Sequence, residues 1–136
     1  MLVETQEAII QALTELNVFR HLDGWQGNIE ELIKVPTKLP SAHVALGEII
    51  YGEEPAAIGS KLSLDDMVWN VIITASNVRD RKSGAVECYS LIESSADKLK
   101  MMKIADGWLW PEGAKLLYAK NGLSVYGLSL RIETEQ

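Results

Sequence analysis

The chain has 136 residues, of which 47% are hydrophobic and 24% charged, as in a single globular domain. Its formal net charge of −6 argues against sequence-driven binding to nucleic acid or to an anionic membrane. No apolar run approaches the roughly 20 residues of a membrane helix, and the first ten residues lack the basic region of a signal peptide. The single Cys88 has no partner for an internal disulfide. We therefore expect one cytoplasmic domain over residues 1–136.

The N-terminal part of the chain predicts a long helix and a short one. Apolar residues recur at three- and four-residue spacing over residues 5–16, which is typical of an amphipathic helix, and Thr5 is suited to cap its start. Two glycines surround a tryptophan within residues 20–27, which indicates a turn. Asn28 then caps a short helix over residues 29–34.

Two strands follow, and we expect them to pair antiparallel as a long hairpin. The first covers residues 41–51, where Gly47 indicates a bulge. The second covers residues 64–76 and alternates with period two, which is typical of a strand inside a sheet. The expected apolar faces consist of Ala42, Val44, Leu46 and Ile50 in the first strand, and Trp69, Val71, Ile73 and Ala75 in the second.

Residues 77–84 form the expected corner between the second strand and a second long helix. That helix is predicted over residues 85–100, with Ser83 as its N-cap. The corner carries a basic cluster formed by Arg79, Arg81 and Lys82. This cluster has two readings: a solvated corner, or a contact with an acidic partner surface such as Glu53–Glu54 of a neighbouring subunit.

Residues 105–113 are expected to be irregular and contain Trp108 and Trp110 on either side of one leucine. Tryptophans belong to the core by default, but a loop cannot easily bury two of them in alternation. The other reading places them at an interface between subunits. We therefore name Trp108 and Trp110, together with the basic cluster, as candidate partner contacts.

The end of the chain predicts a β-hairpin. Two strand-like segments, residues 115–120 and 123–133, are separated by Asn121–Gly122, the sequence that favours a two-residue type I′ turn. The register that this turn predicts pairs Leu117 with Tyr126 and Tyr118 with Val125. The order of elements indicates an α+β domain, an antiparallel sheet of at least four strands with two helices packed on one face.

The residues that carry catalysis or bind metals are sparse. His21 and His43 have no further ligands at metal-binding spacing, and Cys88 falls on an apolar helix face, where a structural thiol is expected. Adjacent carboxylates such as Glu30–Glu31 point apart, and neither a P-loop nor a dinucleotide-binding motif occurs. The sequence predicts no catalytic, cofactor-binding or metal-binding residue, and hence no enzyme.

The succession of segments resembles the Mu-like phage and prophage tail-terminator, or tail-completion, family. The resemblance covers residues 5–134. It rests on the N-terminal amphipathic helix, the GWQG turn with its short acidic helix, Leu39–Pro40 before SAHVALGE, WNVIITAS, GAVECYSLIESSADKL and the closing VYGLSLRIET.

This resemblance implies a structural protein that forms a homo-oligomeric ring, a hexamer, on the head-proximal end of a contractile tail tube. Such a ring stops tail polymerisation and offers a surface to the head-connector proteins at the head–tail junction. An acidic chain also suits a channel through which DNA slides without binding. Two other classes stay open, a small ligand-binding or enzymatic α+β domain and a monomeric adaptor. The mass in solution separates the ring from both.

Overall fold

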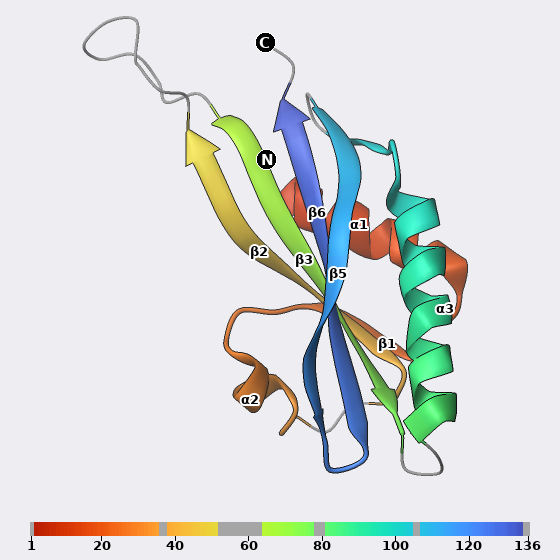
Figure 1. The fold of residues 1–136 in the computed structure, drawn as a ribbon. Coiled ribbons are helices and arrows are strands. Elements are labelled where there is room, and N and C mark those ends of the chain that lie inside the picture. Colours follow the sequence, from red (N-terminus) through yellow and green to blue (C-terminus); the bar gives the residue numbers. More distant parts are fainter. Residues whose placement is uncertain (1, 36–37, 52–63, 78–80, 105–106, 135–136) are drawn as a thin grey trace, which may run out of the picture.

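The computed structural model describes residues 2–35, 38–51, 64–77, 81–104 and 107–134. Nine elements follow one another along these residues (Figure 1). They are α1 (Leu2–Leu16), β1 (His21–Gly24), α2 (Ile29–Leu32), β2 (Ser41–Tyr51), β3 (Leu64–Ser76), α3 (Arg81–Leu99), β4 (Lys103–Ile104), β5 (Gly107–Lys120) and β6 (Leu123–Thr134).

All described strands belong to one sheet of six strands in the order β1-β2-β3-β6-β5-β4. Every neighbouring pair is antiparallel except β1 and β2, which run parallel. The predicted α+β class and a sheet of at least four strands are therefore confirmed. The turn that we expected over residues 20–27 instead contains β1, because four residues are too few to show an alternating pattern.

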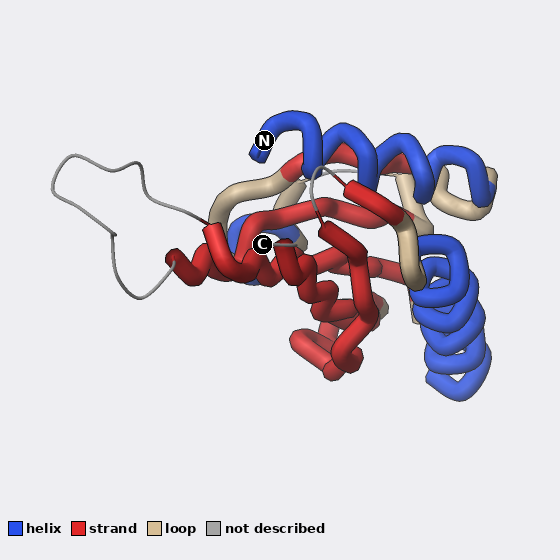
Figure 2. The backbone as a smooth tube through the Cα atoms, turned by 90° about the horizontal axis from the view of Figure 1, so that it is seen from above, coloured by secondary structure: helices blue, strands red, loops and turns tan. Residues whose placement is uncertain are grey.

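Both long helices pack on the same face of this sheet, as predicted (Figures 1 and 2). Helix α1 crosses the strands, whereas α3 runs alongside them. Leu13 of α1 and Leu99 of α3 are fully buried against the sheet. The strands contribute the alternating apolar residues to this core, namely Ala42, Val44, Met67, Trp69, Val71, Ile73, Leu109, Leu128, Leu130 and Ile132.

Two predicted helix starts need correction, and α2 ends at Leu32 where we expected residue 34. Helix α1 begins at Leu2, so Thr5 is buried inside it and is not its N-cap. Helix α3 begins at Arg81, which places Ser83 within the first turn. The physical reason is the same in both cases. The prediction rested on the apolar residues that face the core, whereas the helical hydrogen bonds begin a few residues earlier, at residues that do not face the core. The Asn28 cap of α2 is confirmed, since its Oδ1 accepts from the Glu31 amide at 3.0 Å.

Strand β2 contains the predicted bulge at Gly47, where the register with β3 shifts between Leu46 and Glu48. An added residue moves every later side chain to the opposite face. Ile49 therefore packs on the core. The prediction that Ile50 shares the face of Val44 was wrong, because Ile50 lies beyond the bulge and is 39% exposed. Leu46, which we also assigned to that face, is exposed to the same extent.

The segment that we expected to be irregular before the last hairpin is mostly strand. Residues 105–106 lie outside the described residues, but β5 begins at Gly107 and continues to Lys120. Its register with β6 shifts between Pro111 and Gly113, so Glu112 is a bulge residue. Proline and glycine obscured the strand pattern in the sequence, and the bulge accommodates both without ending the strand.

The predicted Asn121–Gly122 turn is confirmed. Asn121 has φ 55° and Gly122 has φ 76°, which are the positive values that a type I′ turn needs at both central residues. Tyr118 pairs with Val125 as predicted, but Leu116 and not Leu117 lies opposite Tyr126. A second bulge at this point makes Leu117 the extra residue, which the length of the turn alone does not indicate.

The other face of the sheet is covered only in part. Helix α2 lies over one half of it (Figure 1), where Leu32 forms a small second core with Ile72 and Val125. None of the described helices is long and apolar enough to cross a membrane.

Candidate interaction surface

Two exposed tryptophans and an ion-paired arginine lie on the half of this second face that α2 leaves uncovered. Alternation along β5 places Trp108 and Trp110 outward, while Leu109 between them is fully buried. Trp110 pairs across the sheet with Arg131 of β6, which in turn pairs with Val68 of β3. We call the set Asp66, Val68, Trp108, Trp110, Glu112 and Arg131 the tryptophan surface.

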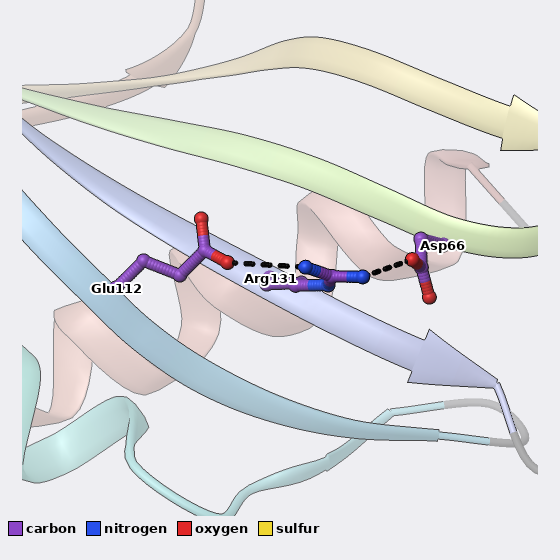
Figure 3. Close-up of polar contacts among 3 residues, drawn as sticks. All are labelled: Asp66, Glu112 and Arg131. Atoms are coloured by element: carbon purple, nitrogen blue, oxygen red, sulfur yellow. Dashed lines mark hydrogen bonds and ion pairs between the residues drawn. The ribbon is translucent and has the colours of Figure 1, made fainter.

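Arg131 connects three strands across this surface (Figure 3). Its Nη2 donates a hydrogen bond to Oδ2 of Asp66 on β3, and its Nη1 lies 3.6 Å from Oε1 of Glu112 on β5. Glu112 is the bulge residue of β5, which brings its carboxylate beside the guanidinium. Asp66 is 16% exposed and Glu112 40% exposed, so solvent screens the second pair more than the first. The ion pairs hold Arg131 in place beside Trp110.

Trp108 and Trp110 are 40% and 51% exposed. The ammonium of Lys103 lies 5.8 Å from the centre of the Trp108 ring, a cation–π contact of about 0.5–1 kcal/mol at an exposed site. Large aromatic side chains in this position are typical of the centre of a protein interface. Neither tryptophan is therefore a core residue, and their role as partner contacts stays a prediction.

A groove of about 660 Å³ adjoins this surface. Residues of the β1–α2 connection, of α2 and of four strands line it, namely Gly27, Ile29, Ala45, Leu46, Asn70, Ile72, Glu112, Gly113, Ala114, Lys115, Leu117, Gly127 and Ser129. A Cβ at Gly127 would lie 3.0 Å from Cδ1 of Leu117, so glycine permits β5 to fold closely over β6 here. The lining is mixed, with Glu112 and Lys115 as its charged side chains. This arrangement defines no particular small ligand.

The structure leaves the predicted basic cluster largely untested. Arg79 lies outside the described residues, as do Glu53 and Glu54, and the side chain of Arg81 is likewise not described. Lys82 is exposed in the first turn of α3 and not in a loop. A cation there gains nothing from the helix dipole, which favours anions at this end.

The histidines and the cysteine have structural surroundings. His43 is 3% exposed, and its ring lies 5.2 Å from that of His21 and 5.9 Å from that of Trp25. Burial and then the charge of His21 lower the pKa of His43, while Asp23 opposes them. Burial, assisted by Glu87, raises the pKa of Cys88 to about 11. Such a thiol is a poor nucleophile at neutral pH.

Metal coordination has little support either. Among the described residues, no group of three or more histidine, cysteine, aspartate or glutamate side chains is placed to hold an ion. What the structure brings together is a surface with two exposed tryptophans, an ion-paired arginine and a groove. Arg131, Asp66 and Glu112 were missed from the sequence, because cross-strand pairs depend on the register of three strands and on one bulge.

The chain matches no family model and none of the curated proteins. It does match solved structures. One is a chain of the virion of a native gene transfer agent (GTA) particle, with a TM-score of 0.58 and 16% sequence identity. The match covers 96% of this chain and 94% of the other, so the two proteins share one fold from end to end. At 16% identity the likeness concerns the fold alone.

Proposed function

We propose that this protein is a structural component of a phage-type particle, without enzymatic activity, and that it acts as a tail terminator. In this role it forms a ring, a hexamer, on the head-proximal end of a tail tube, stops tail growth and receives the head-connector proteins. The observation that carries the proposal is the end-to-end likeness of fold to a chain of a gene transfer agent virion. The resemblance of the segments to the Mu-like family supports the narrower role.

The surface chemistry agrees with a protein that works by contact. Trp108 and Trp110 expose large aromatic area beside an ordered arginine, a combination enriched at the energetic centres of interfaces. The net charge of −6 suits a ring through which DNA passes without being held. A terminator needs such contacts and no reactive group, which accords with an unreactive Cys88 and a buried His43.

The proposal is tested by deleting the gene from the phage or prophage that carries it. We expect tails of unregulated length that fail to join heads, and both defects should be restored by the wild-type protein supplied from a plasmid. Negative-stain images of the purified protein at high concentration should show rings. Normal tail length and head joining in the deletion would overturn the terminator role.

A second function, a small-ligand-binding domain, would use the groove beside Gly127. Its volume of about 660 Å³ is within the range of ligand sites. Its polar side chains, however, are an amide, a carboxylate, an ammonium and a hydroxyl, and this mixture matches no particular ligand. A protein that stays monomeric at high concentration and is not needed for tail assembly would favour this alternative.

A further inference from the structure

Strand β5 has an outer edge that the described chain leaves largely unpaired. The two residues of β4 pair with Gly107 and Trp108, and Leu109 exchanges backbone hydrogen bonds with Met101 and Met102. From Trp110 to Lys120, no described residue forms a backbone hydrogen bond with the side of β5 that faces away from β6. Pro111 and the Glu112 bulge disrupt its upper end, because proline lacks the amide and a bulge breaks the ladder. A free edge therefore extends from Gly113 to Lys120, with the bulge at Leu117 inside it.

Strand β2 has a second free edge on the opposite side of the sheet. Strand β1 pairs with β2 only from Ser41 to Val44, and the Val44 carbonyl then accepts from the Trp25 amide at 2.9 Å. From Ala45 to Tyr51, no described residue bonds to the outer side of β2. The two free edges are of similar length, and each contains one bulge, at Gly47 in β2 and at Leu117 in β5. Each still offers unpaired backbone groups to a further strand.

The direction of the strands decides how two copies can meet. Between β2 and β5 lie three antiparallel pairings, so the two strands run in opposite directions within one chain. Rotation about a ring axis keeps each strand's direction along that axis. A β5 edge that meets the β2 edge of a rotated copy therefore meets it antiparallel, the more favourable pairing.

The charges along the two edges are complementary. Lys115 and Lys120 lie on the free part of β5, and Glu48 lies on the free part of β2; none of these three forms an ion pair with a described residue. Pairing β5 with β5 of a second copy about a two-fold axis would place lysines together, which is unfavourable across strands. Pairing β5 with β2 places lysines near a carboxylate.

Apolar side chains accompany each edge. Leu116 of β5 is 52% exposed, on the side of the sheet where Tyr126 packs edge-to-face on Tyr89 of α3. On β2, Leu46 and Ile50 are each 39% exposed. Single exposed apolar residues are common on protein surfaces, but here they lie on both of the long unpaired strand edges. Burying these side chains between two copies would stabilise the contact in addition to the backbone hydrogen bonds.

We propose that the free edge of β5, Gly113–Lys120, pairs antiparallel with the free edge of β2, Ala45–Tyr51, in the next copy of this chain. The contact is head-to-tail, and it deepens the proposed ring function, on which it rests. The free part of β5 lies near the Asn121–Gly122 turn, whereas the free part of β2 lies at the other end of the strands. Neighbouring copies that pair in this way are therefore shifted relative to each other along the strands. Sheets that close into a barrel show such a shift, because their strands are tilted relative to the axis. The sheet then continues from one protomer into the next.

Disulfide cross-linking tests the pairing. In a Cys88→Ser background, the chain is given Glu48→Cys on β2 together with Ala114→Cys or Ala119→Cys on β5, two positions that sample two registers. Under mild oxidation we expect one of the two double variants to give a ladder of covalent multimers. Each single variant alone should stay uncross-linked, and a mixture of two single variants should stop at dimers.

The outcomes separate this contact from the ring itself. Oligomers seen by light scattering without a ladder would overturn the edge pairing and leave the terminator proposal intact. Dimers formed by Ala114→Cys or Ala119→Cys alone would replace it with two-fold pairing of β5. A strictly monomeric wild type, in the presence of tail tubes as well, would count against both proposals.

A charge-reversal series gives a second, independent test. We expect the double variant Lys115→Glu with Lys120→Glu to weaken self-association about five- to tenfold, in line with rim ion pairs, and less so in high salt. Adding Glu48→Lys to the same chain should recover most of the loss. Circular dichroism serves to confirm that each variant is folded. Equal association in all variants would overturn the proposed edge contact.

Discussion

The two faces of the same sheet differ in what they bury. On the face covered by α1 and α3, Trp69 and Leu130 pair with each other and lie in a continuous apolar core. At the neighbouring position of each strand, Asn70 pairs with Ser129 on the opposite face, where both residues line the groove. Adjacent positions in one strand therefore have opposite surroundings. One face forms the main core, and the other is only partly covered.

The second face is itself divided into a buried part and an exposed part. Near α2, Ile72 and Val125 are buried in a small separate core. Beyond it, Trp108 and Trp110 are exposed although they are the largest side chains on β5. Mutations on the two faces should consequently separate stability from assembly.

The largest effect is expected for Trp69→Ala on the helix-covered face. Trp69 is 2% exposed within the main core, and truncating a buried aromatic residue costs about 3–5 kcal/mol through lost burial and the cavity that remains. Urea unfolding followed by circular dichroism measures the free energy of unfolding. A loss below about 1 kcal/mol would mean that this face is not the stabilising one.

The next effect concerns the turn that joins β5 to β6. Gly122 has φ 76°, which a β-branched residue adopts only with strain, so Gly122→Val should cost about 1–3 kcal/mol. Gly113→Ala is the matched control on the same hairpin. A Cβ there would meet nothing within 4 Å, so the free energy of unfolding should stay within about 0.5 kcal/mol of wild type. Equal stability of both variants would contradict the turn assignment.

A smaller loss is expected for Asp66→Asn on the second face. The change removes the carboxylate that accepts from Arg131 but retains the shape of the side chain. Partly exposed ion pairs contribute about 0–1 kcal/mol, and salt screens them. The difference in unfolding free energy between wild type and variant should therefore shrink as salt is raised. A difference that does not depend on salt would show that packing and not charge holds Arg131.

A pH-dependent effect follows from His43, whose pKa burial lowers. Its pKa is lowered in the folded protein, whereas the unfolded chain takes up the proton near the ordinary value of about 6.5. As pH falls below that value, the unfolded state binds more protons than the folded state, so stability decreases. His43→Gln should flatten this part of the profile, measured by urea unfolding at pH 7.5 and pH 5.5. An unchanged slope would assign it to other groups.

The fold and the candidate contact residues could be predicted from the sequence only in part. Strand β3 and the Asn121–Gly122 turn were predictable, because each depends on residues that are neighbours in the chain. The change of face after Gly47 and the strand character of Gly107–Gly113 were not, because a bulge shifts the alternation only in relation to a partner strand. Trp108 and Trp110 were found as candidates from their spacing, whereas their exposure depends on the fold.

The smallest loss of stability is expected for Trp110→Ser, and it separates the two faces most directly. Trp110 is 51% exposed, so its removal should change the free energy of unfolding by no more than about 0.5 kcal/mol. Leu109→Ala, one residue away on the buried side, should cost about 2–5 kcal/mol.

Assembly should show the reverse order. If the tryptophan surface contacts a partner, Trp110→Ser should weaken tail completion or self-association by a factor of about 30 or more, since aromatic anchors at interface centres contribute about 2 kcal/mol or more. Leu109→Ala should assemble normally below its lower unfolding temperature. The measurements are unfolding in urea, light scattering and the fraction of completed particles. A Trp110→Ser protein that assembles like wild type would assign the exposed tryptophan no part in the contact and would leave the proposed pairing of the free part of β5 unaffected.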